Sequence, residues 1–117
     1  MNTKVLSIVL SLIFLASGGA KLAGLDFEIA AFTRWGYPLW FMYFTGVIEV
    51  AGAIGLLVRR ISALASAGLA LVMTGAVATH VLHAEWLMMI VAFGIFGLAV
   101  TRAWLGRADL QALVGRT

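Results

Sequence analysis

The sequence predicts an all-α integral membrane protein, a four-helix bundle whose consecutive spans run up, down, up and down. Composition is the first observation, because 63% of the 117 residues are hydrophobic and 11% are charged, whereas a soluble domain has about 25% charged residues. The second observation is a set of four apolar segments, each long enough to cross the roughly 30 Å hydrocarbon core of a bilayer. This composition excludes a soluble enzyme, a disordered chain and a nucleic-acid-binding protein.

The apolar segments are predicted to be helices that form one transmembrane domain over residues 1–117. Backbone groups in hydrocarbon must bond within their own segment, and continuous apolar runs do not fit the alternating pattern of barrel strands. Four spans of about 20 residues leave little chain for a further domain. The predicted spans are 5–23, 39–58, 61–82 and 86–105, and 106–117 is predicted to be a short cytoplasmic tail.

The first segment also resembles a secretory signal peptide. Lys4 precedes an apolar stretch that reaches the small residues Ser17-Gly18-Gly19-Ala20. Because the apolar run continues beyond them, we expect this segment to stay in the protein as a span. Cleavage would instead leave a three-span chain that begins at Lys21.

The longest connection, between the first two spans, is predicted to contain a short helix in the membrane interface. Over 26–35 the apolar residues Ile29, Phe32 and Trp35 recur at helical spacing, and Asp26 is the expected N-cap. Gly36-Tyr37-Pro38 is expected to end this helix and to lead into the second span.

Lys and Arg residues predict that both termini lie in the cytoplasm, because loops on that side carry an excess of basic residues. With four spans, the two termini and the turn at 59–60 share one side. Only two basic residues, Lys21 and Arg34, fall on the other side. The six basic residues on the predicted cytoplasmic side are Lys4, Arg59, Arg60, Arg102, Arg107 and Arg116.

Small residues in the spans predict close packing between helices. Gly52 and Gly55 lie in the second span, and Gly94 and Gly97 lie in the fourth. These glycines are interpreted as packing positions rather than as parts of a binding site.

Ionisable residues inside spans are the strongest functional signal, because a charge at the bilayer centre costs about 2.5–3.5 kcal/mol on insertion scales. Glu49 lies near the middle of the second span, so we expect it to face the bundle, either protonated or paired with a base. Lys21 and His80 lie near the outer ends of the first and third spans. A snorkelling lysine and an interfacial histidine are the simpler interpretations of these two residues.

A polar pocket in the outer half of the bundle is the functional alternative, since these three residues come from three helices at similar depth. Two threonines would add hydroxyl groups, and the aromatic residues Trp40, Tyr43 and Phe44 would rim the mouth. Such a pocket suits an amphipathic ligand, and a quinone or an isoprenoid lipid is the candidate. The residues expected to bind the ligand or to handle protons are Glu49, Lys21, His80, Thr45, Thr79, Tyr43 and Trp40.

No metal site and no covalent cofactor are predicted. His80 and His83 are spaced i, i+3 on a helix and Glu85 follows them, but the sequence offers no convincing third ligand. The chain has no cysteine, which excludes thiolate metal sites and cysteine-attached haem.

The glycine-rich segments around these residues resemble the DoxX-like family of small four-span membrane proteins. The resemblance rests on residues 18–24, 38–49, 52–57 and 75–80, and it extends to about residue 103. It includes the pattern Gly-x-x-Glu-x-x-Gly, which places Glu49 between Gly46 and Gly52.

The resemblance implies a four-helix bundle in a bacterial cytoplasmic membrane, without implying one activity. The family is named for a subunit of a thiosulfate:quinone oxidoreductase, and other members resemble partners in thiol-redox or oxidative-stress complexes. A distant animal relative is a receptor-assembly chaperone. We therefore expect a quinone- or isoprenoid-lipid-binding accessory subunit of a membrane redox system, whose redox centre lies in a partner protein. The alternatives are a non-catalytic assembly factor or a small proton-coupled transporter. Catalytic residues are not assigned, and homo-oligomerisation stays open.

Overall fold

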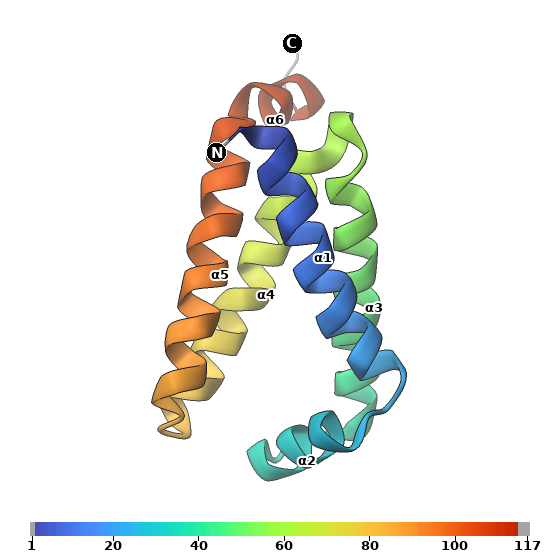
Figure 1. Ribbon diagram of the computed structural model, residues 1–117, viewed down its shortest axis with the longest axis vertical. Coiled ribbons are helices and arrows are strands. Elements are labelled where there is room, and N and C mark those ends of the chain that lie inside the picture. Colours follow the sequence, from blue (N-terminus) through green and yellow to red (C-terminus); the bar gives the residue numbers. More distant parts are fainter. Residues whose placement is uncertain (1, 115–117) are drawn as a thin grey trace.

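The computed structural model describes residues 2–114, and nearly all of them are helical (Figure 1). Within this range no strand occurs, so the predicted all-α class is confirmed. The long helices are α1 (Thr3–Leu22), α3 (Leu39–Leu56), α4 (Ser62–Leu82) and α5 (Trp86–Leu105). The short elements are α2 (Asp26–Trp35), the 3₁₀ turn η1 (Arg59–Ile61) and α6 (Arg107–Val114).

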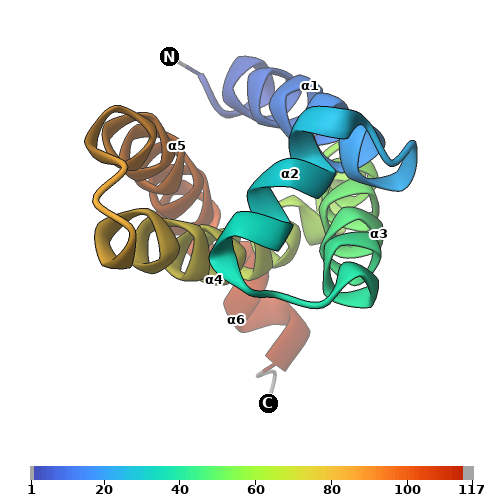
Figure 2. The ribbon, with the colours of Figure 1, turned by 90° about the horizontal axis from the view of Figure 1, so that it is seen from below.

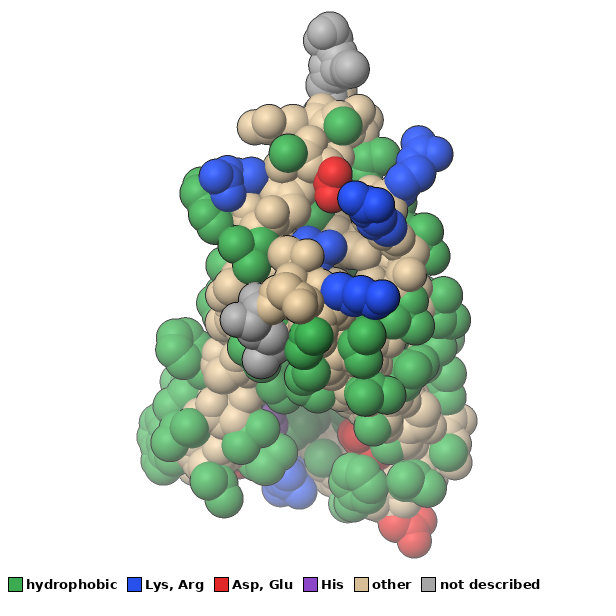
Figure 3. Space-filling model, turned by 45° about the horizontal axis from the view of Figure 1, so that its top comes forward, with side chains coloured by type: hydrophobic (Ala, Val, Ile, Leu, Met, Phe, Trp, Pro, Cys, Tyr) green, Lys and Arg blue, Asp and Glu red, His purple; other side chains and the backbone are tan. Residues whose placement is uncertain are grey.

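Each long helix is long and apolar enough to cross a membrane. Their outward faces carry large apolar side chains, and Leu71, Leu82 and Leu87 are each more than 70% exposed. Figure 3 shows hydrophobic side chains around the sides of the molecule, with most visible Lys and Arg side chains near the end that carries the termini. Such a surface is stable in lipid, because hydrocarbon replaces the protein core as the partner of the apolar faces.

The long helices form two pairs that diverge toward one end of the molecule. Consecutive long helices run in opposite directions, so both termini lie at the same end, which we call the terminal end (Figure 1). Helix α1 packs along α3, and α4 packs along α5. At the opposite end, the α2 end, α2 crosses the space between the two pairs (Figure 2).

Glycines allow α1 and α3 to approach closely. A Cβ atom on Gly18 would lie 2.9 Å from the carbonyl oxygen of Gly46, and one on Gly46 would lie 2.9 Å from the Cβ of Lys21. Gly52 likewise faces Leu69 of α4. The packing role predicted for Gly94 and Gly97 is wrong within this chain, because a Cβ on either would meet no atom within 4 Å.

Buried serines join the helices in the terminal half of the bundle. Ser11 Oγ donates a 2.9 Å hydrogen bond to the carbonyl oxygen of Ala53, and Ser66 Oγ donates one of 2.7 Å to that of Ala99. Hydrogen bonds of this kind contribute about 0.6 kcal/mol on average between membrane helices. They lie beside the apolar core, whose fully buried members are Leu6, Leu10, Phe14, Ala53, Leu56 and Leu69.

The N-cap of helix α2 lies one residue earlier in the sequence than predicted. Leu25 is the N-cap and Asp26 is the first helical residue, so the prediction that Asp26 caps this helix is wrong. At the other end, Gly36 adopts a left-handed φ of 82° and its N–H bonds to the carbonyl oxygens of Phe32 and Thr33. Only glycine adopts this conformation readily, which explains where the helix stops.

Candidate functional site: a cavity beneath α2

A cavity of about 960 Å³ lies between the diverging helix pairs and beneath α2. This volume is at the upper end of the range of roughly 300–1,000 Å³ that is usual for small-molecule sites. Most of the lining is apolar and includes Phe14, Phe32, Phe41, Ile48 and Met73. The polar and charged lining residues are Ser17, Lys21, Glu28, Arg34, Tyr37, Thr45, Glu49, Thr79, His80 and Glu85.

The first polar cluster surrounds Lys21 in the last turn of α1. Its Nζ lies 3.1 Å from Oε1 of Glu49 on α3 and 3.4 Å from Oε2 of Glu28 on α2. It also donates a 2.9 Å hydrogen bond to Ser17 Oγ. Lys21, Glu28 and Glu49 are 8%, 9% and 4% exposed, so this ionic cluster is buried. It fastens α1, α2 and α3 to one another.

Ser17 connects the two charged groups of this cluster. Its hydroxyl accepts from Lys21 and donates a 2.9 Å hydrogen bond to Oε1 of Glu49. Residues four apart lie on the same face of a helix, which explains why Ser17 reaches Lys21. Oε1 of Glu49 therefore receives both the ammonium group and the serine hydroxyl.

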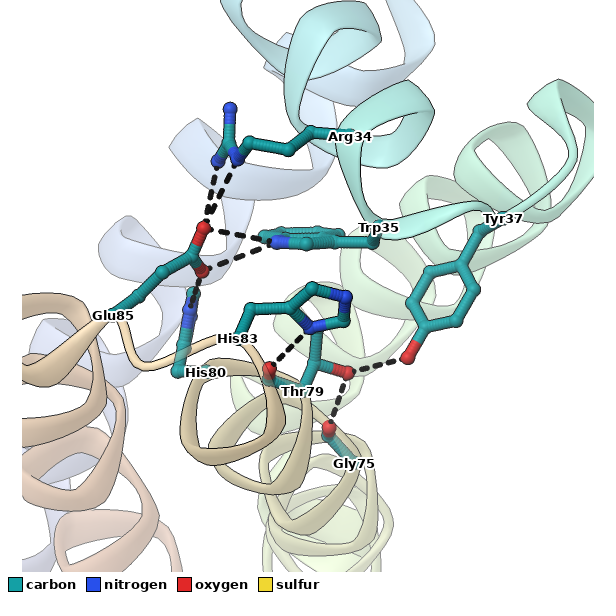
Figure 4. A network of polar contacts seen from close by, with 8 residues as sticks. All are labelled: Arg34, Trp35, Tyr37, Gly75, Thr79, His80, His83 and Glu85. Atoms are coloured by element: carbon teal, nitrogen blue, oxygen red, sulfur yellow. Dashed lines mark hydrogen bonds and ion pairs between the residues drawn. The ribbon is translucent and has the colours of Figure 1, made fainter.

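The second cluster surrounds Glu85, which lies in the turn between α4 and α5 (Figure 4). Arg34 Nη2 lies 3.0 Å from Oε2, and Trp35 Nε1 donates to both carboxylate oxygens at 3.1 and 3.2 Å. His80 Nδ1 lies 2.8 Å from Oε1. The hydrogen bond from His80, followed by those from Trp35 and Arg34, lowers the pKa of Glu85 to about 2. This carboxylate joins α2 to the α4–α5 turn.

Thr79 of α4 forms a third contact, with the connection between α2 and α3 (Figure 4). Its hydroxyl donates a 2.9 Å hydrogen bond to the carbonyl oxygen of Gly75. The hydroxyl of Tyr37 lies 2.7 Å from Thr79 Oγ1 and is therefore the donor of that pair. His83 Nδ1 donates to the carbonyl oxygen of Thr79 and does not line the cavity.

The structure places most of the predicted site residues around the cavity, but in separate clusters. Lys21 and Glu49 belong to one cluster and His80 to the other, whereas the three were predicted from the sequence to form one polar group. The hydroxyl of Thr45 donates to the carbonyl oxygen of Phe41 in its own helix. Trp40 and Thr79 also line the cavity.

Tyr43 lies outside the cavity. Its side chain is 38% exposed, and its hydroxyl lies beside Gly24 in the turn that follows α1. The predicted place of this residue at the rim of the pocket therefore differs from the one observed.

Five polar or charged cavity residues were not predicted as site residues from the sequence: Ser17, Glu28, Arg34, Tyr37 and Glu85. Ser17 carries a usable signal, because its i, i+4 spacing places it over Lys21. Glu28 carries a weaker one, since it precedes Phe32 by four residues and shares its buried face. The sequence gives no signal that Arg34 and Glu85 belong to the site, because charged residues are ordinary in a membrane-interface loop.

Four helices of membrane-spanning length around a cavity with buried ionic groups define a small integral membrane protein. The sequence model of the DoxX-like family matches residues 5–103, and the chain belongs to this family. Over 89 residues it is 30% identical to the uncharacterized protein YdgD of Bacillus subtilis (strain 168), a match that covers 73% of this chain and 78% of the relative. No solved structure gives a significant match.

Proposed function

We propose that this protein is an accessory subunit of a membrane redox system and binds a quinone or an isoprenoid lipid in the cavity beneath α2. The observation that carries the proposal is the joint lining of this cavity by apolar side chains and by two ionic clusters. An amphipathic ligand satisfies both parts, because its headgroup meets the charged groups while its tail lies against apolar side chains.

Exposed side chains at the edge of the cavity support this class of ligand. Phe44 of α3 and Leu71 of α4 line the cavity and are also 52% and 76% exposed. Side chains that face both the cavity and the exterior lie at its edge. A tail that leaves the cavity between these helices would enter the surrounding lipid.

The packed terminal half favours a binding site over a transport path. Leu10, Phe14 and Leu69 are at most 1% exposed and belong to a core that closes the bundle beyond the cavity. A ligand that enters from the α2 end or from the side would therefore leave by the same route. The chain has no cysteine, so thiol-redox chemistry belongs to a partner protein in this proposal.

Filling the cavity wall tests the proposal. Gly75 lines the cavity, and a Cβ there would meet no atom within 4 Å. The Gly75→Leu side chain would occupy space that the ligand needs, so we expect affinity for an alkylated benzoquinone and for its hydroquinone to fall at least tenfold. Quenching of tryptophan fluorescence in nanodiscs measures both affinities, because Trp35 and Trp40 line the cavity.

Gly94→Leu is the matched control. Gly94 is also an exposed glycine in a long helix whose Cβ would meet no atom within 4 Å, but it does not line the cavity. Wild-type affinity in this variant and loss in Gly75→Leu support the proposal. Equal affinities in both variants, or binding of neither probe to the wild type, overturn it.

A further inference from the structure

We infer that the cavity selects a headgroup that donates hydrogen bonds, so that it takes a hydroquinone in preference to the corresponding quinone. This inference rests on the proposed function and specifies its ligand. A hydroquinone carries two hydroxyl donors, whereas the oxidised ring presents only carbonyl acceptors. The polar atoms of the cavity that have no hydrogen-bond partner in the protein determine which of the two forms binds more tightly.

Lys21 has no donor left for a ligand. An ammonium group has three hydrogens, and three oxygen atoms lie within 3.4 Å of Lys21 Nζ. These oxygens belong to Ser17, Glu28 and Glu49. Lys21 also supplies one positive charge for two carboxyl groups, so the cluster has a surplus of acceptors that a hydroxyl donor would stabilise.

In its ionised form, paired with Lys21, Glu49 presents a free acceptor. Its Oε1 receives Ser17 and Lys21, and Oε2 has no partner among residues 2–114. Within that range, every side-chain nitrogen or oxygen atom that is fully buried has a hydrogen-bond partner. Because Oε2 has no partner, it is not fully buried and is accessible. Because Glu49 lines the cavity and is 4% exposed, the cavity is where a ligand can reach this oxygen.

His80 presents a second acceptor. Its Nδ1 faces the carboxylate of Glu85 at 2.8 Å, and an ionised carboxylate can only accept. Nδ1 therefore carries a proton, and Nε2 is an acceptor in the neutral form of the ring, the form that this inference invokes. Nε2 has no partner among the described residues, and by the same reasoning as for Glu49 it is accessible from the cavity.

The other donors around the cavity are already engaged. The indole of Trp35 donates to Glu85, and the hydroxyl of Tyr37 donates to Thr79. The hydroxyl groups of Ser17, Thr45 and Thr79 also donate within the protein. Arg34 and Trp40 retain N–H donors, but the Arg34 side chain is 57% exposed and Trp40 is 66% exposed. The buried part of the cavity thus offers acceptors to a headgroup.

Three probes with the same alkyl chain test the inference in nanodiscs: the hydroquinone, the benzoquinone and the hydroquinone dimethyl ether. We expect the hydroquinone to bind at least tenfold more tightly than either of the others, because only it donates. Equal affinity of the hydroquinone and its dimethyl ether overturns the inference while leaving the proposed function intact. Absence of binding by all three overturns the proposed function itself.

Glu49→Gln provides a sharper test, because the surroundings fix the orientation of the new amide. Ser17 and Lys21 donate to the position of Oε1, so the amide oxygen belongs there and the NH₂ group takes the position of Oε2. The free acceptor becomes a donor, and we expect the preference to move at least tenfold toward the benzoquinone. Asp26→Asn is the control, since Asp26 is exposed and does not line the cavity.

His80→Asn is a second variant, for the case that Glu49→Gln fails to fold. The asparagine amide can donate to Glu85 as Nδ1 does, but it lacks an equivalent of Nε2. We expect folded protein with a hydroquinone preference reduced at least threefold. Unchanged preference in folded His80→Asn and folded Glu49→Gln would overturn the assignment of these atoms.

Discussion

Single side chains fasten α2 over the cavity from two sides. Lys21 holds Glu28 on one side, and Glu85 holds Arg34 and Trp35 on the other. Charge-assisted hydrogen bonds of this kind are stronger than neutral ones. The position of α2, and with it the roof of the cavity, therefore depends on a small number of ionised groups.

Glu85 makes this closure sensitive to acid. Its pKa is lowered from the ordinary value of 4.5 to about 2, so its stabilising contribution is present above about pH 4.5. That contribution is lost as the pH falls from 4.5 toward 2, because protonation then removes the acceptor for His80 and Arg34. We expect Trp35 fluorescence to show a transition in this window, and Glu85→Gln to lack it.

Asp109→Asn is the control for the acid titration. Asp109 is an exposed carboxyl on α6, at the terminal end. This variant should keep the wild-type transition, because its carboxyl is remote from α2. An unchanged transition in Glu85→Gln would show that another group controls the position of α2.

The sequence identifies buried charges better than it identifies their partners. Glu49 could be recognised because a carboxyl in an apolar span requires compensation. Glu28 and Glu85 lie in segments where charges are ordinary, and only the docking of α2 brings them to the cavity. Lys21 and His80 lie in different clusters because each of them has a different acidic partner.

Whole helices are the part of the fold that hydropathy predicts well, because bilayer thickness fixes the length of each apolar segment. Which helices pair is harder to predict, since the choice depends on local surface shape. Gly18 and Gly46 lie at the α1–α3 crossing, whereas a Cβ on Gly94 or Gly97 would meet no atom of the described residues within 4 Å. Spacing of small residues alone does not separate these cases.

Gly18→Leu tests the α1–α3 crossing. The added side chain would meet Val50 and the backbone of Gly46, at 2.8 and 2.9 Å from its Cβ. Overpacking of this kind costs about 1–3 kcal/mol, so we expect a lower apparent Tm in detergent. The measurement is thermal unfolding followed by circular dichroism.

Gly19→Leu is the matched control for Gly18→Leu. It changes the neighbouring glycine of the same helix, where a Cβ would meet no atom within 4 Å. Its apparent Tm should stay near that of the wild type. Similar Tm values for the two variants would contradict close packing at this crossing.

At the scale of the whole molecule, composition predicts the environment but not the cavity. The apolar surface follows from the 63% hydrophobic content, which lipid alone can accommodate. The cavity depends on how far the two helix pairs diverge and on the place of α2, and both depend on long-range packing (Figure 2). No local sequence pattern encodes either quantity.

The distribution of charge between the two ends predicts the orientation of the molecule. Both basic residues of the α2 end are paired with acids, Lys21 with Glu28 and Glu49 and Arg34 with Glu85. At the terminal end, Arg59 and Arg60 form no ion pair with another described residue. The positive-inside rule counts Lys and Arg residues, so the larger number of them at the terminal end predicts that this end lies in the cytoplasm.

Single cysteines measure this orientation without background labelling, because the chain has no cysteine of its own. Asp26 is exposed at the α2 end and Asp109 at the terminal end. In intact bacterial cells, we expect Asp26→Cys to react with a membrane-impermeant maleimide and Asp109→Cys to react only after permeabilisation. The opposite pattern would place the cavity toward the cytoplasm, so that its ligand would exchange with partners on that side.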